Sequence, residues 1–136
     1  MEQPTKSIIS IGELIYSMLT SNAEVMATAN KIFPVIAEDA ANLPYICYKR
    51  TALSQDTTKT KPGAYSASVQ FWCYAEDYHQ SIVMAEALRK ALDGQRYTYV
   101  DGDGNALHAR SIVLSDTEES WADGAYSQVL VFQFKV

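Results

Sequence analysis

The sequence lacks the features by which membrane, secreted and nucleic-acid-binding proteins are recognised. No apolar run approaches the ~20 residues that a helix needs to span a bilayer, and the polar N-terminus has no basic segment followed by the apolar stretch of a signal peptide. There are 11 basic residues against 16 acidic ones, giving a formal net charge of −5. Such a chain lacks the broad positive field of a nucleic-acid binder and is unsuited to an anionic membrane surface. We expect a soluble protein that is made and used in a cytosol.

Cysteine and histidine are also scarce, with two of each. Cys47 and Cys73 lie in separate apolar segments without the CxxC or clustered histidine of a metal site, so buried free thiols are favoured over a disulfide or a metal. His79 and His108 have no Ser or Cys beside them in a known nucleophile motif. No glycine-rich phosphate-binding motif is present either. The sequence therefore predicts no enzymatic activity, no cofactor and no metal.

The composition is that of one ordinary globular domain. The chain has 136 residues, of which 48% are hydrophobic and 20% charged, and a chain of this length buries roughly two-thirds of its unfolded surface. We expect a single domain over residues 1–136, with residues 1–7 as a flexible leader.

The first third of the chain predicts two helices and an extended segment. Residues 10–13 have the form of a capping box, although Ser7 or Thr5 could also start the first helix. Residues 21–24 repeat the pattern and predict a short second helix. A proline then restricts its neighbour, so residues 32–36 form an extended connector or a short strand. The first helix has one apolar stripe: Ile8, Ile11, Ile15, Met18 and Leu19.

Two strands and a third helix are expected next. Residues 43–53 are rich in aromatic and apolar side chains, and residues 64–75 alternate with a period of two. The polar residues between them, 54–63, predict a mobile loop at the tip of a long hairpin. Asp77 can cap a helix that ends at Gly94. The predicted centre of the core lies where this helix meets the second strand: Phe71, Cys73, Ile82, Ala85, Leu88 and Leu92.

The remaining residues predict three more strands. Residues 97–100 and 106–115 flank a turn at 101–105. That turn resembles the start of a calcium loop, but Ile112 stands where an EF-hand needs a bidentate Glu. After an acidic stretch and a turn at 123–124, residues 126–136 form the last strand. The fold class is α+β, with element order ααββαβββ and helices packed on one face of an antiparallel sheet.

The clearest candidates for contact with a partner are four basic residues. Lys49, Arg50, Lys59 and Lys61 form a small positive group in an acidic chain. They are either a solvated strand end and loop or a docking site for an acidic partner. The nine tyrosines fit strands, and a sheet so aromatic on both faces leaves rings at the surface unless a partner covers them.

The order of several segments adds a family resemblance. Lys-Ile-Phe-Pro at 31–34 is followed by Leu-Pro-Tyr-Ile-Cys-Tyr at 43–48. The strand Val-Gln-Phe-Trp-Cys-Tyr-Ala at 69–75 then leads into Asp77 and a helix. Over residues 8–93 this resembles the tail-completion, or head–tail joining, proteins of long-tailed bacteriophages and prophages, a family related in fold to the phage tail terminators. Residues 95–136 fit by element order only.

The resemblance implies a structural role in virion assembly. Members of the family form rings, usually hexamers, that cap the tail tube and offer a surface to the head connector. The implied partners are other copies of the chain, the tail tube protein and the head connector protein, with no membrane, and DNA only passes through the channel. The implied location is the virion tail, or the host cytoplasm during assembly. The alternative is a small-ligand-binding or enzymatic α+β domain with a pocket between sheet and helices. A cluster of titratable groups would favour that alternative, and the sequence offers none.

Overall fold

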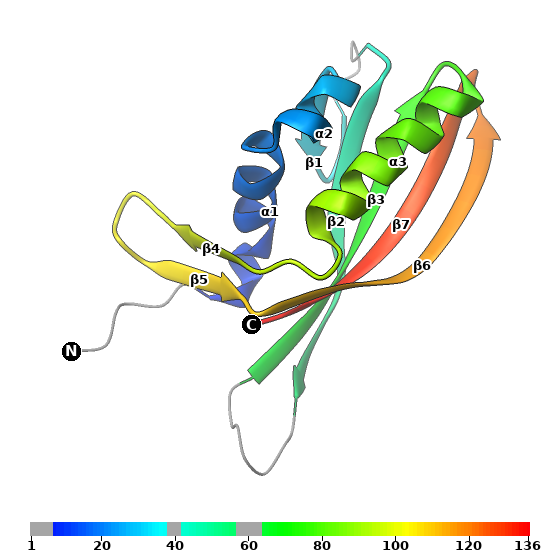
Figure 1. Cartoon of the computed structure of the whole chain (residues 1–136). Helices are drawn as coiled ribbons and strands as arrows, with labels where there is room; N and C mark the ends of the chain where they lie inside the picture. Colours follow the sequence, from blue (N-terminus) through cyan, green and yellow to red (C-terminus); the bar gives the residue numbers. More distant parts are fainter. Residues whose placement is uncertain (1–6, 38–41, 57–63) are drawn as a thin grey trace.

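The structure is a computed structural model that describes residues 7–37, 42–56 and 64–136 (Figure 1). The helices are a 3-10 turn at Ile8–Ser10, α1 (Ile11–Thr20), α2 (Ala23–Thr28) and α3 (Tyr78–Leu92). The strands are β1 (Lys31–Pro34), β2 (Tyr45–Asp56), β3 (Ala64–Ala75), β4 (Tyr97–Val100), β5 (Ala106–Ala109), β6 (Ser111–Ala122) and β7 (Ala125–Lys135).

Five of the strands form one sheet, in the order β1-β2-β3-β7-β6, and β4 and β5 form a separate hairpin. The predicted α+β class is confirmed. The sheet is mixed, however, because β1 pairs with β2 in parallel while every other pair is antiparallel. A parallel neighbour needs a connection that returns the chain to the start of the first strand. The extended segment predicted at residues 32–36 is therefore an edge strand over Lys31–Pro34, followed by a turn at Val35 and Ile36.

The second half of the chain also differs from the predicted element order. Residues 106–115 do not form one strand, because the chain leaves the β4–β5 hairpin at Arg110 and enters the main sheet. The Arg110 N–H donates to the Lys135 carbonyl over 2.7 Å. The acidic stretch that followed is part of strand β6, which runs to the turn at Asp123 and Gly124. The observed order is therefore ααβββαββββ.

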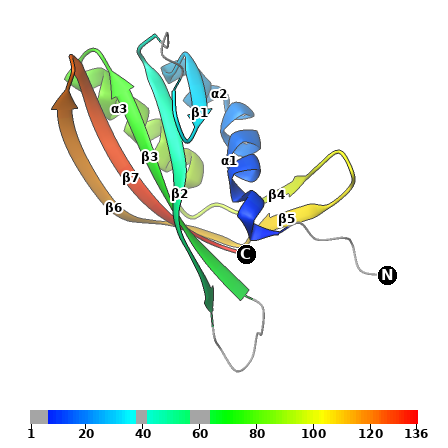
Figure 2. The same ribbon diagram turned by 180° about the vertical axis from the view of Figure 1, so that it is seen from behind.

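All helices cover one face of the sheet, and the other face is open (Figure 2). The core fills the space between the helices and the sheet. Its largest fully buried side chains are Phe71, Phe132, Phe134, Ile11, Leu14, Ile15, Leu19, Ile46, Met84, Leu88, Leu92 and Ile112. Two aromatic pairs lie at the centre of this layer. The Phe71 and Phe132 rings form a T-shaped pair with centroids 5.5 Å apart, and the Phe71 and Phe134 rings form a tilted pair with centroids 6.4 Å apart. Offset contacts of this kind add to the free energy of apolar burial.

The predicted core is correct in β3 and partly correct in α3. Phe71, Cys73, Leu88 and Leu92 are buried, whereas Ile82 and Ala85 are only half-buried. Ser81, Met84 and Ala87 are the other buried residues of the helix. A serine can be buried here because its Oγ donates to the Tyr78 carbonyl over 2.6 Å and accepts from Gln128 Nε2 over 3.3 Å. A prediction from the spacing of apolar residues misses a buried serine whose hydroxyl has hydrogen-bond partners.

Helix ends follow local chemistry closely. The Asp77 carboxylate accepts from the His79 N–H over 2.9 Å, as predicted for the cap of α3. Gly94 ends that helix with a φ of 75°, a conformation that glycine adopts without steric cost. At the first helix, the Ser7 hydroxyl rather than Ser10 caps the chain, accepting from the Ile9 N–H. Asn22 rather than Ser21 caps α2, accepting from the Val25 N–H over 3.0 Å.

The β2–β3 hairpin is longer than predicted. Residues 54–56 continue the register with β3, so they are strand rather than loop, because polar residues donate and accept backbone hydrogen bonds as well as apolar ones do. The rest of the predicted mobile loop, residues 57–63 with Lys59 and Lys61, lies outside the described residues. Cys47 and Cys73 are buried free thiols, as expected. None of the helices in the described ranges is long and apolar enough to cross a membrane.

Candidate interaction surfaces

The first candidate surface is the outer edge of β2. β1 pairs with β2 only from Tyr45 to Tyr48, and the last hydrogen bond on this side runs from the Val35 N–H to the Tyr48 carbonyl over 2.7 Å. Beyond this point, no strand of the described chain pairs with the outer side of β2. Every side chain from residue 49 to residue 55 is exposed. We refer to residues 49–55 as the basic edge.

Two of the four predicted contact residues lie at the start of the basic edge. Lys49 pairs with Gln70 and Arg50 with Val69, and consecutive strand residues point to opposite faces. Lys49 therefore lies on the open face. Arg50 lies on the helix face, where its Nη1 donates to the Ile9 carbonyl over 3.4 Å. Neither forms an ion pair among the described residues, so both positive charges are available to a partner. Lys59 and Lys61 lie outside the described residues.

An exposed apolar group lies beside Arg50. Val35, directly after β1, has a φ of 67°, which is unusual for a β-branched residue and costs conformational energy. Two hydrogen bonds hold the chain in a turn here: the Val35 N–H donates to the Tyr48 carbonyl, and the Ile36 N–H donates to the Pro34 carbonyl over 2.8 Å. Val35 is 65% exposed, Ile36 76% and Ile9 66%. Ile9, Val35 and Arg50 line one shallow groove on this edge.

The second candidate surface is the outer edge of β6, at the other side of the sheet. Its first residues are covered by the end of α3, because the Leu114 N–H donates to Asp93 Oδ1 over 3.0 Å and the Gly94 N–H to the Ile112 carbonyl over 2.7 Å. Every residue from 115 to 122 is exposed. In this segment β6 pairs only with β7 within the described chain. We refer to residues 115–122 as the acidic edge.

Side chains of the acidic edge divide between the two faces of the sheet. Asp116 and Glu118 pair with Val131 and Val129, placing them on the open face, and neither takes part in an ion pair among the residues described. Trp121 pairs with Tyr126 on the helix face and is 61% exposed. The sequence showed these acidic residues but not their strand. The Asp-Gly turn at 123–124 was the available signal, since such a turn joins two paired strands of similar length.

The third acid of this edge is already engaged within the chain. Glu119 Oε2 accepts from the Tyr78 hydroxyl over 2.8 Å and from Gln128 Nε2 over 3.2 Å. Both hydrogen bonds lower the pKa of the Glu119 carboxyl, and the bond from Tyr78 has the larger effect. The same bond raises the pKa of the Tyr78 hydroxyl. The Tyr78 ring also packs on Tyr126 at 5.8 Å, so this cluster fastens the start of α3 to the β6–β7 hairpin.

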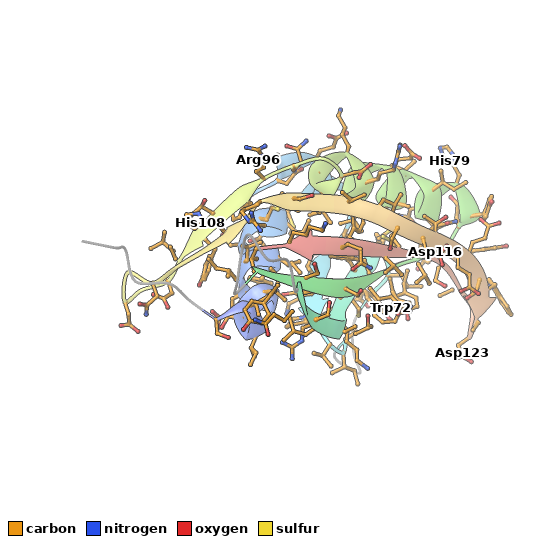
Figure 3. All side chains as sticks on the ribbon, turned by 90° about the horizontal axis from the view of Figure 1, so that it is seen from below. Trp72, His79, Arg96, His108, Asp116 and Asp123 are labelled. Carbon is orange, nitrogen blue, oxygen red and sulfur yellow. The ribbon has the colours of Figure 1, made fainter. Side chains whose placement is uncertain are left out.

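Aromatic side chains gather on the open face across three strands. The Phe33 and Tyr45 rings lie 5.7 Å apart, and Tyr45 and Tyr74 lie 5.1 Å apart. Partial burial raises the pKa of both tyrosines. Trp72 continues this surface on the side of the sheet away from α3, opposite His79 (Figure 3). Phe33 is buried and Tyr45, Trp72 and Tyr74 are half-buried, so the rings predicted at the sheet surface are only partly exposed on this face.

The grooves beside the helices are open, and one of them lies between α1 and β1, lined by Glu13, Ser17 and Tyr99 among others. Phe71, Phe132 and Leu88 are 0% exposed and fill the centre of the layer between α3 and the sheet. His79 and His108 lie far apart on the surface (Figure 3); His108 Nδ1 is 2.8 Å from Thr98 Oγ1. Among the described residues, no three His, Cys, Asp or Glu side chains are grouped so that they could hold a metal.

Comparison with known proteins gives a fold relationship. Neither a protein-family profile nor a curated protein matches the sequence. A chain from the virion of a native gene transfer agent (GTA) particle has 16% identity and a TM-score of 0.68, covering 96% of this chain and 98% of that one. The bacteriophage SPP1 gp17 protein has 15% identity and a TM-score of 0.50, over 94% and 89% of the two chains. The protein therefore shares its fold, over nearly its whole described length, with a component of a gene transfer agent virion and with a bacteriophage protein.

Proposed function

We propose that the protein is a structural component of a phage or phage-like virion. In this role copies of the chain form a ring, with a hexamer as the expected state, that caps the tail tube and joins it to the head connector. The observation that carries the proposal is the fold shared with the GTA virion chain, at a TM-score of 0.68 over 98% of that chain.

The surfaces are consistent with this role. The two sheet edges that lack a partner strand over part of their length suit a protein that works by contact with other proteins. The net charge of −5 suits a channel through which DNA passes without being held, because like charges repel. The partners are other copies of the chain, the tail tube protein and the head connector protein. The site of action is the virion tail, after assembly in the host cytoplasm. No step in this role requires catalysis.

The test is direct observation of assembly. Native mass spectrometry and negative-stain electron microscopy of the purified chain, over a hundredfold range of concentration, are expected to show rings with a central opening. Adding the tail tube protein of the same genome should place the ring on tube ends and limit tube length. A chain that stays monomeric at every concentration, with and without tube protein, contradicts the proposed function.

A further inference from the structure

The two edges of the sheet that lack a partner strand are matched in three respects: strand direction, charge and apolar surface. The basic edge begins where pairing with β1 ends, and the acidic edge begins where the end of α3 ceases to cover β6. Strand edges with free backbone groups are templates for pairing with another chain. In both segments all side chains are exposed on both faces. A strand of this kind contributes little to the core of its own protomer.

Strand direction favours pairing between the two different edges. β2, β3, β7 and β6 follow one another with antiparallel pairing at each step, so β6 runs antiparallel to β2. Two copies placed side by side in the same orientation therefore bring β6 of one next to β2 of the other in antiparallel alignment. That is the more stable type of ladder. The sheet would then continue from one copy into the next with its helix faces on the same side.

Charge opposes the pairing of an edge with its own kind. Residues 49–55 contain Lys49 and Arg50 and no acid, and residues 115–122 contain three acids and no base. Two basic edges or two acidic edges would repel each other, while a basic and an acidic edge attract. Lys49, Asp116 and Glu118 all lie on the open face of their own edges. A contact between two different surfaces is heterologous and closes into a ring when the rotation allows it.

Apolar surface matches on the helix face. Antiparallel alignment brings the Ala122 end of the acidic edge beside the Lys49 end of the basic edge. Trp121 then arrives at Arg50 and at the exposed group formed by Ile9, Val35 and Ile36. Tryptophan and arginine are the residues that most often dominate interface energetics. The strain at Val35 is consistent with this use, because the turn projects that side chain from the edge instead of extending β1.

We propose that the occupant of each edge is a second copy of this chain: the acidic edge of one copy pairs with the basic edge of the next. This inference rests on the proposed ring and names the surfaces that form it. The free parts of β2 and β6 lie toward opposite ends of the sheet (Figures 1 and 2). Strands in such a ring are therefore inclined to its axis.

Two variants test the proposal, each damaging one edge. K49E/R50E reverses the charge of the basic edge, and W121A removes the anchor from the acidic edge. Each alone should raise the concentration needed for half-assembly by about tenfold or more. Mixed at equal concentration, they should form a one-to-one dimer, through the intact acidic edge of the first and the intact basic edge of the second, and no ring. R96E and V100A are matched controls at exposed positions of the chain away from both edges, and should assemble like the wild type.

A second measurement does not depend on how well the variants fold. Hydrogen exchange of the wild-type chain is compared above and below its assembly concentration, and residues 49–55 and 115–122 should gain protection together. Normal assembly of either variant, or protection gained only elsewhere, overturns the edge pairing while leaving the ring intact. A wild-type chain that never assembles overturns the ring and, with it, this inference.

Discussion

The packing of α3 against the sheet can be tested by truncating Leu88 to Ala. Leu88 is 0% exposed and belongs to the central apolar cluster with β3 and β7. Removing a buried leucine side chain and leaving a cavity costs about 2–5 kcal/mol of unfolding free energy. With an unfolding entropy of about 2.1 cal/mol/K per residue, a 136-residue chain changes by about 0.29 kcal/mol per degree. A loss of about 3 kcal/mol then lowers Tm by about 10 °C.

The assay is denaturant unfolding followed by circular dichroism at a concentration where the chain is monomeric. V83A is the control on the same helix, since Val83 is 42% exposed, and it should change the unfolding free energy by no more than about 0.5 kcal/mol. A second pair of variants tests which side of the helix faces the sheet. M84A should destabilise the chain more than I82A does, because Met84 is 0% exposed whereas Ile82 is half-buried. A cost for L88A below about 0.5 kcal/mol, or the reverse order of the pair, would refute the packing described.

Three other features give checkable outcomes. V35G should keep or raise the unfolding free energy, by up to about 1 kcal/mol, because glycine adopts the positive φ of 67° without strain; V35A should show no gain, and a loss with V35G would contradict the strained turn. Y78F should raise the pKa of Glu119 towards its usual range, measured by NMR titration. The folded-state pKa of Glu119 is lowered, so the stability that Glu119 contributes is present above its unfolded-state pKa and is lost as the pH falls through its folded-state pKa. In Y78F the unfolding free energy should therefore fall less steeply with decreasing pH in this acidic range. Burial raises the pKa of Cys73 to about 12 and also raises that of Cys47, so neither thiol should react with a maleimide at pH 8 until the chain unfolds.

Features set by neighbouring residues in the chain were predictable from the sequence. The cap at Asp77, the stop at Gly94 and the long β2–β3 hairpin each follow from a short motif or from strict alternation. The same holds for the turn at 101–105, where Asp101 Oδ1 accepts from the N–H groups of Asp103 and Asn105, both over 2.9 Å. Local chemistry decides these elements, so the surrounding fold does not overrule it.

Features set by distant residues were not predictable. The parallel pairing of β1 depends on where the chain returns after Pro34. The strand character of residues 115–122 depends on β7, since acidic side chains have low strand propensity on their own. The candidate surfaces show the same division. Lys49 and Arg50 were identified from their charge, but their acidic counterpart looked like a loop, because only the register with β7 makes it an edge.

The aromatic row of Phe33, Tyr45 and Tyr74 has a mechanical consequence. β1 is a four-residue strand at the margin of the sheet, and so short a ladder opens easily. Rings from three successive strands lie across its pairing with β2, at centroid distances of 5.7 and 5.1 Å, each contact adding about 0.5–1.5 kcal/mol. These ring contacts resist sliding of β1, β2 and β3 past one another. Replacing Phe33 and Tyr45 by leucine would leave every backbone partner of β1 in place, yet let the strand fray faster than the rest of the sheet.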